Sequence, residues 1–182
     1  MARRLIGKLR MSPKFRRMLV PVDFSPLSTA AIRYAVDLAR AFDGTVHVLH
    51  AWEVPAYLRP DLTIWSGEIS ATLADQVRLG AENAMREFSK TNGLEGNPAV
   101  TYEVVQGTAY NAILSVAKDG VFDLIVMGTH GRTGISHVLL GSVAEKVVRH
   151  ARCPVLTIRG PGADLPAQEA QGTVPDARSN IQ

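Results

Sequence analysis

The chain has 182 residues, of which 46% are hydrophobic, so it is long enough for one globular domain with a sizeable core. No stretch approaches the roughly 18 consecutive apolar residues of a membrane span, which predicts a soluble protein. The net charge is +3, but residues 1–17 carry seven of the 20 basic residues and no acid, which leaves 13 basic against 17 acidic residues elsewhere. The body of the chain is therefore mildly acidic, and we expect no nucleic-acid partner.

The first 14 residues form a basic segment with a Met11-Ser12-Pro13 breaker and no apolar stretch of the length that a secretory signal needs. We predict a flexible basic arm over residues 1–14. An organellar transit peptide and a contact with an anionic surface are the alternatives, and Met11 or Met18 could be the physiological start.

A strand-helix-strand unit follows this segment. Residues 15–22 predict the first strand, Ser25 the N-cap and Pro26 a first-turn residue of a helix that runs to about Phe42. Its expected buried stripe recurs at steps of three and four residues: Ala31, Ala35, Leu38, Ala39 and Phe42. Residues 45–52 predict the second strand, which completes a βαβ unit with a right-handed crossover.

The next segment, residues 53–67, contains prolines and a glycine together with aromatic residues. We predict an irregular loop that partly covers the domain. A nucleic-acid stacking platform is the alternative, but only Arg59 lies among the aromatics there. Residues 68–90 are rich in helix formers and predict a long core helix. Its apolar stripe consists of Leu73, Val77, Ala81, Ala84, Met85 and Phe88.

The rest of the chain continues the alternation of strand and helix. Strands are predicted at residues 100–106, 122–127 and 153–158, and helices at residues 109–118 and 142–149. This alternation predicts an α/β fold with an open parallel sheet and helices on both faces. Without an internal repeat, residues 15–159 form a single domain, and residues 160–182 have the composition of a disordered tail.

A glycine-rich loop begins where the fourth predicted strand ends, with glycines at 128, 131 and 134, and Gly141-Ser142 opens the next helix. Glycines give the backbone access to positive φ and leave no Cβ between it and a ligand. Unpaired N–H groups and the positive dipole end at the start of a helix favour a phosphate. The sequence thus favours an anion-binding loop, and a tight strand-to-helix turn is the alternative.

The spacing Gly128-x2-Gly131-x9-Gly141-Ser142 is similar to the nucleotide-binding motif of the universal stress protein family. The similarity extends to residues 18–25 and 153–158, so it covers residues 15–159. The resemblance implies an adenine nucleotide alpha hydrolase-like fold, with five parallel strands in the order 3-2-1-4-5. It also implies an ATP-binding regulatory or stress-response protein that forms a homodimer through its last strand, Pro154 to Ile158.

The family's nucleotide site, carried over by position, gives the candidate residues. The residues expected at the base and ribose are Pro21, Val22, Asp23, Ala51 and Met127. The residues expected at the ribose and phosphates are Gly128, Thr129, Gly131, Arg132, Thr133, Gly134, Gly141, Ser142, Val143 and Ala144. Asp23 could also hold a Mg²⁺ ion bound to the nucleotide, because magnesium uses one or two carboxylates beside phosphate oxygens. The alternative is that Asp23 only caps the following helix.

Residue types that would drive other chemistry are sparse. The chain has no Walker loop and no Gly-x-Ser-x-Gly elbow, so we expect it to bind ATP but to hydrolyse it slowly at most. A slow ATPase or adenylating enzyme of this fold, and a nucleotide-free stress protein acting through partners, are the alternatives. The single Cys153 predicts a reducing, cytoplasmic location. Among five histidines with no metal-binding spacing, only His130 in the loop is a candidate site residue.

Overall fold

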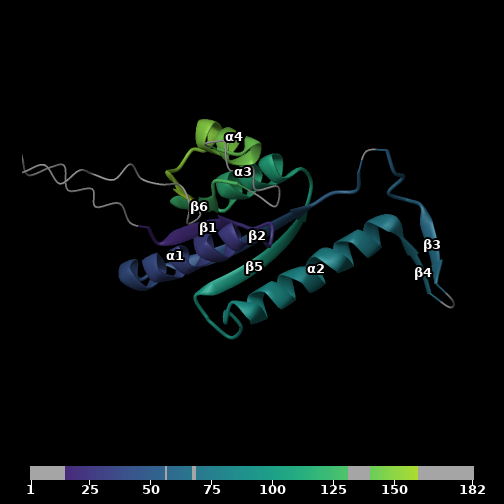
Figure 1. The fold of residues 1–182 in the computed structure, drawn as a ribbon, viewed down its shortest axis with the longest axis horizontal. Coiled ribbons are helices and arrows are strands. Elements are labelled where there is room, and N and C mark those ends of the chain that lie inside the picture. The colour runs from purple at the N-terminus through teal and green to yellow at the C-terminus, as the bar shows by residue number, and fades with distance from the viewer. Residues whose placement is uncertain (1–14, 56, 67–68, 131–139, 160–182) are drawn as a thin grey trace, which may run out of the picture.

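The computed structural model describes residues 15–55, 57–66, 69–130 and 140–159. The predicted basic arm and tail lie outside these residues. The elements in chain order are β1 (Arg17–Pro21), α1 (Pro26–Phe42), β2 (Thr45–Trp52), β3 (Thr63–Ser66), β4 (Ile69–Thr72), α2 (Leu73–Thr91), β5 (Val100–Gln106), α3 (Ala109–Asp119), β6 (Leu124–Gly128), α4 (Ser142–His150) and β7 (Val155–Ile158) (Figure 1).

Five strands form one parallel sheet in the order β5-β2-β1-β6-β7. Strand β1 lies at the centre, where Leu19 pairs with His47 of β2 on one side and with Ile125 of β6 on the other. Once the separate β3-β4 pair is set aside, this is the predicted order 3-2-1-4-5. The predicted α/β fold with an open five-stranded parallel sheet is confirmed.

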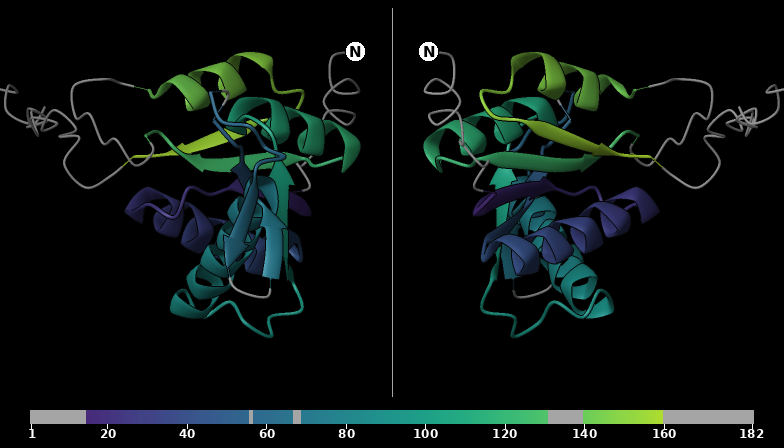
Figure 2. Two further views of the ribbon diagram at one scale, coloured as in Figure 1. Left: turned by 90° about the vertical axis from the view of Figure 1, so that its right-hand side faces the viewer. Right: turned by 90° about the vertical axis from the view of Figure 1, so that its left-hand side faces the viewer.

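Helices cover both faces of this sheet. Alternate residues of β1 point to opposite faces, so Met18 joins a core with α1 and α2, whereas Leu19 joins a core with α3 and α4. Figure 2 shows the two pairs of helices on opposite sides of the sheet. In the described part of the chain, no helix combines the length and the apolar composition needed to cross a bilayer.

Helix α1 begins and ends as the sequence predicts. Ser25 is the N-cap, and its hydroxyl oxygen accepts a hydrogen bond from the backbone N–H of Ser28. The helix ends at Asp43, which takes the left-handed conformation with φ 52°. The buried stripe is shorter than predicted, because Phe42 is 41% exposed and packs edge-on against Phe15 at the margin of the domain.

Between β2 and α2 the sequence prediction is wrong in two respects. The expected loop and the first turn of the expected helix contain an antiparallel hairpin, in which Thr63 pairs with Thr72. The hairpin lies at the N-terminal end of α2, away from the five-stranded sheet, and does not cover the domain (Figure 1). The helix starts at Leu73, because β3 and β4 pair with each other up to Thr72, which also supplies the N-cap of the helix.

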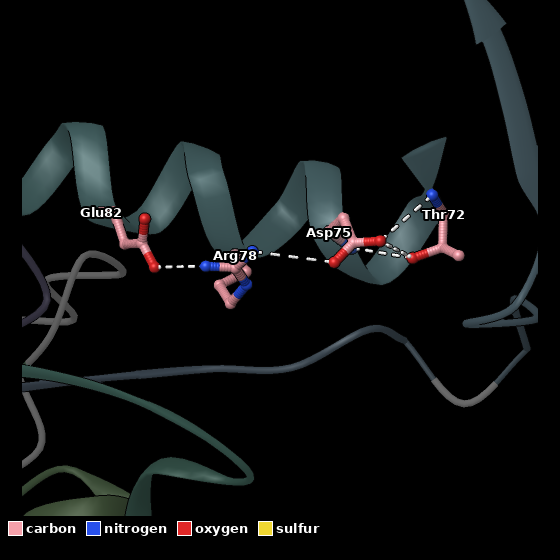
Figure 3. A network of polar contacts seen from close by, with 4 residues as sticks. All are labelled: Thr72, Asp75, Arg78 and Glu82. Atoms are coloured by element: carbon pink, nitrogen blue, oxygen red, sulfur yellow. Dashed lines mark hydrogen bonds and ion pairs between the residues drawn. The ribbon is translucent and has the colours of Figure 1, made fainter. Parts of the chain in front are cut away.

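The start of α2 is fixed by a reciprocal pair of hydrogen bonds, shown in Figure 3. The hydroxyl oxygen of Thr72 accepts from the Asp75 N–H at 3.1 Å, and the Asp75 carboxylate accepts from the Thr72 N–H at 3.4 Å. The Thr72 hydroxyl also donates to this carboxylate at 2.6 Å. The Arg78 guanidinium forms two ion pairs, with Nη2 3.7 Å from Asp75 Oδ1 and Nη1 2.7 Å from Glu82 Oε1. Hydrogen bonds from Thr72, with the nearby charge of Arg78, lower the pKa of the Asp75 carboxyl.

Replacing Asp75 with asparagine should lower stability in a pH-dependent way. Because the pKa of Asp75 is lower in the folded chain than its ordinary value of 3.8, the ionised carboxylate stabilises the fold above that pH. That contribution is lost as the pH falls through the folded-state pKa. Urea unfolding should therefore show a constant difference between the wild type and D75N from about pH 7 to 5, and a smaller one below about pH 4.

The matched control for this prediction is Glu87→Gln, at an exposed position of the same helix. This change should leave the unfolding free energy nearly unchanged across the same pH range. A D75N difference that keeps its full size down to about pH 3 would contradict the assigned role of the Asp75 carboxylate.

Candidate functional site

A cavity of about 440 Å³ opens at the carboxyl ends of β1 and β6. The helix that follows β1 packs on one face of the sheet, and α4, which follows β6, packs on the other. The two connections therefore diverge and leave a crevice between them, as open α/β sheets do where they bind ligands. The lining residues are Pro21, Val22, Asp23, Ser28, Leu49, His50, Ala51, Ala109, Ile113, Met127, Gly128, Thr129, His130, Gly141, Ser142, Val143 and Ala144.

The structure brings together most of the residues expected at the site. Eleven of them line the cavity: Pro21, Val22, Asp23, Ala51, Met127, Gly128, Thr129, Gly141, Ser142, Val143 and Ala144. The other four, Gly131, Arg132, Thr133 and Gly134, lie outside the described residues. The loop histidine His130 also lines the cavity.

Sequence reasoning missed five lining residues, namely Ser28, Leu49, His50, Ala109 and Ile113. For two of them the spacing in the sequence gives a partial indication. Ala109 and Ile113 are four residues apart and so share one face of the helix that follows β5. Ser28 gives no such indication, because its place at the cavity depends on how the chain turns after β1.

One part of the cavity wall is apolar. Leu49 of β2 and Ile113 of α3 are 1% and 3% exposed, and Met127 of β6 is buried beside them. Ala51 adds a small side chain at the end of β2. The polar groups Asp23, Thr129 and Ser142 line other parts of the same cavity. A flat apolar group and a polar or charged group could both be held there.

The chain between β1 and α1 is pinned to β2 at two points. The Val22 N–H donates to the Leu49 carbonyl at 2.8 Å, and His50 Nδ1 lies 2.9 Å from the Val22 carbonyl oxygen. Because a carbonyl only accepts, His50 Nδ1 is the donor in this contact. Phe24 has a φ of 65°, and its ring centroid lies 4.2 Å from that of His50, with the two ring planes tilted by 35°. These contacts stabilise a left-handed residue that is unfavourable for a side chain with a Cβ.

The Asp23 carboxylate is held by the start of α1. Its Oδ1 accepts from the Ser28 hydroxyl at 2.6 Å and from the Ser25 N–H at 3.1 Å. The Asp23 N–H in turn donates to Ser28 Oγ at 3.0 Å. Asp23 therefore stabilises the turn into α1 and also lines the cavity. A structural role at the start of α1 and a place in the candidate site are thus compatible.

Two glycines of the motif, Gly128 and Gly141, lie where the chain packs closely against itself. Gly128 does not have a positive φ, and neither does Gly141, whose φ is −68°. A Cβ on Gly128 would lie 2.9 Å from Cβ of Leu27, and one on Gly141 would lie 3.0 Å from the Thr129 carbonyl oxygen. At these two positions glycine is needed because the chain approaches itself closely.

Backbone contacts join the end of β6 to the start of α4. The Gly141 N–H donates to the Thr129 carbonyl at 2.7 Å, and the Thr129 N–H donates to the Ile158 carbonyl at 2.9 Å. Thr129 is 2% exposed, and its hydroxyl lies 3.0 Å from His130 Nδ1. Gly141 is the N-cap of α4 and brings no side-chain acceptor to the first-turn N–H groups, so this helix end suits an anion.

The described residues include no group of three or more histidine, cysteine, aspartate and glutamate side chains that could hold a metal ion. Cys153 packs at the edge of the core that α3 and α4 cover. Burial, with a smaller effect from Asp123, raises the pKa of its thiol. A raised pKa lowers the thiolate fraction, which disfavours a nucleophilic role for Cys153.

Comparison with known proteins decides the family. A sequence model described as the universal stress protein family matches residues 14–159, which is most of the chain. The chain belongs to the universal stress protein family. A universal stress protein of Thermus aquaticus is 36% identical over 146 residues, which cover 80% of this chain and 99% of the relative. The universal stress protein MJ0531 of Methanocaldococcus jannaschii is 30% identical over 148 residues, 81% of this chain and 84% of the relative.

Solved structures of universal stress proteins share the fold. UspA of Lactobacillus plantarum superposes with a TM-score of 0.65 at 31% identity, covering 80% of this chain and 99% of its own. A universal stress protein solved in complex with cAMP superposes with a TM-score of 0.57 at 22% identity, covering 80% of this chain and 98% of its own. At that identity the second comparison shows the fold alone.

Replacing Gly128 with alanine should destabilise the domain by about 1–3 kcal/mol, because the added methyl group would be forced against Leu27 of α1. Gly80 is the matched control, since it lies in α2 and a Cβ there meets nothing within 4 Å. Gly80→Ala should stabilise by about 0.5–1 kcal/mol. Urea unfolding measures both changes, and an unchanged stability of the Gly128 variant would show that the close approach is not what requires glycine.

Proposed function

We propose that this universal stress protein binds an adenine nucleotide, with ATP as the first candidate, and acts as a nucleotide-dependent regulatory protein of the stress response. One observation carries the proposal: a cavity at the switch point of the sheet joins an apolar wall to polar groups and a helix N-terminus. Its volume of about 440 Å³ is that of a small-molecule site.

The shape of the cavity supports one orientation of the nucleotide. The adenine would lie against Leu49, Ala51 and Met127, where the wall is apolar. The ribose would lie near Asp23, whose carboxylate accepts hydrogen bonds from hydroxyl groups. The phosphates would lie near the start of α4, where Ser142, Val143 and Ala144 offer N–H groups.

Two further contributions belong to this proposal. From the sequence, Gly131, Arg132, Thr133 and Gly134 would complete the phosphate cradle, since a guanidinium group suits phosphate oxygens. Asp23 lies on the cavity wall, so its carboxylate fits a Mg²⁺ ion that the phosphates also hold. The lone cysteine supports a cytoplasmic site of action.

We propose that the site holds the nucleotide rather than turning it over rapidly. Oδ1 of Asp23 accepts hydrogen bonds from both Ser28 and Ser25, which commits that oxygen to the turn rather than to proton abstraction. Backbone N–H groups and a helix N-terminus would stabilise a bound phosphate in the ground state. Such uniform binding lowers the dissociation constant without raising the chemical rate.

Replacing Ala109 with phenylalanine should abolish ATP binding in an otherwise folded protein. Ala109 lines the cavity at the start of α3, so the larger side chain would occupy the space proposed for the nucleotide. Ser115→Phe, at an exposed position of the same helix, should leave ATP affinity unchanged. Isothermal calorimetry, with circular dichroism to check folding, measures both. Equal ATP affinity in the wild type and Ala109→Phe would place the nucleotide elsewhere.

We also propose a homodimer through β7. Among the described strands, β7 pairs with β6 alone, so its other edge is a template for a second strand. Leu156 of β7 is 37% exposed, and Tyr34, which lies on helix α1 and not on the edge strand, is 57% exposed. Leu156→Glu should shift the full-length protein from dimer to monomer in light scattering, and Tyr34→Glu should not. A wild type that is monomeric at tens of micromolar protein, on the order of ordinary assay conditions, would contradict the dimer.

A further inference from the structure

We infer that Ser28 is a positioning residue of the candidate site: its hydroxyl holds the Asp23 carboxylate at the cavity wall, and its effect on ligand binding passes through Asp23. The inference rests on the proposed function for the identity of the ligand. The contact between Ser28 and Asp23 can be tested without any ligand.

Ser28 makes two hydrogen bonds to the same residue. Its hydroxyl donates to Asp23 Oδ1 at 2.6 Å, and its oxygen accepts from the Asp23 N–H at 3.0 Å. Ser28 is only 5% exposed, and both residues line the cavity. One hydroxyl group thus ties the backbone and the side chain of Asp23 to the first turn of α1.

Several other described contacts of this turn fix its backbone. Val22 is tied to β2 through Leu49 and His50, and the Phe24 ring packs against His50 and against Phe88 of α2. With the backbone held, what is left to set is the rotation of the Asp23 side chain. Ser28 supplies the shorter of the two described hydrogen bonds to Oδ1, and the Ser25 N–H supplies the other.

The helix-capping role belongs to a different serine. Ser25 Oγ accepts from the Ser28 N–H at 3.3 Å and so caps α1, whereas the contact of Ser25 with Asp23 Oδ1 comes from its backbone N–H. Ser25→Ala therefore removes the cap, together with a 3.5 Å contact from its hydroxyl to Ser28 Oγ, and keeps the backbone donor to Asp23. Ser28→Ala keeps the cap and removes the hydroxyl that holds Asp23. The two variants separate helix stability from carboxylate positioning.

The ligand-free test is amide hydrogen exchange measured by NMR on the full-length protein. In Ser28→Ala, exchange should become about tenfold faster at the Asp23 N–H, because this group loses its acceptor. Exchange at the Ser25 N–H should become faster by a similar factor, because its acceptor, the Asp23 carboxylate, is no longer held in place. Ser28→Thr keeps the hydroxyl and should preserve protection at both. Unchanged exchange of the Ser25 N–H in Ser28→Ala would overturn the inference, because Ser28 would then not hold the carboxylate.

The ligand-bound test is a double-mutant cycle of Ser28→Ala and Asp23→Ala, with ATP affinity measured by calorimetry. Ser28→Ala alone should weaken binding about tenfold, and Ser25→Ala less than twofold. In the Asp23→Ala background, Ser28→Ala should change the affinity less than twofold, because the carboxylate through which Ser28 acts is absent. An equal loss in both backgrounds would overturn the inference. A wild type that binds no nucleotide refutes the proposed function instead, and the exchange measurement then decides the role of Ser28.

Discussion

The central position of β1 in the sheet is the constraint on which the rest of the structure depends. Because Leu19 pairs with both His47 and Ile125 in parallel strands, the carboxyl ends of β1, β2 and β6 lie side by side. The helices that follow β1 and β6 then pack on opposite faces. The crevice between them is a consequence of this topology.

Short-range contacts convert this crevice into a defined site. After β1 the chain is held by hydrogen bonds that join Val22 to Leu49 and His50. It then turns at Phe24, which has a left-handed conformation, and enters α1 at the N-cap Ser25. After β6, the Thr129 carbonyl holds the Gly141 N–H, which sets the start of α4. The polar groups of the cavity therefore come from segments whose backbone is fixed by neighbouring strands, and a site of this kind is largely preformed.

Periodicity and cap residues in the sequence predict most of the fold. Strands β2 and β5 and the ends of α1 match the prediction, since their apolar patterns and the Ser25-Pro26 cap act locally. The β3-β4 hairpin was not predicted, because its short strands are followed directly by residues that favour a helix. The two strands also form a separate sheet, outside the alternating pattern of strand and helix. For the site, the glycine motif indicated the right segments. It did not indicate Ser28, whose role depends on a turn with a left-handed phenylalanine, nor the packing role of Gly128 against Leu27.

The claim that the switch-point crevice is the nucleotide site can be tested most directly by NMR titration of the wild-type protein with ATP. The account predicts amide shift changes concentrated at Asp23, Ala51 and Thr129, and at Ser142 and Val143 in the first turn of α4. The smaller groove lined by Asp43 and Asn97, at the end of α1, should stay unchanged. Shift changes confined to that groove, or none at millimolar ATP, on the order of the weakest specific affinities, would contradict the account.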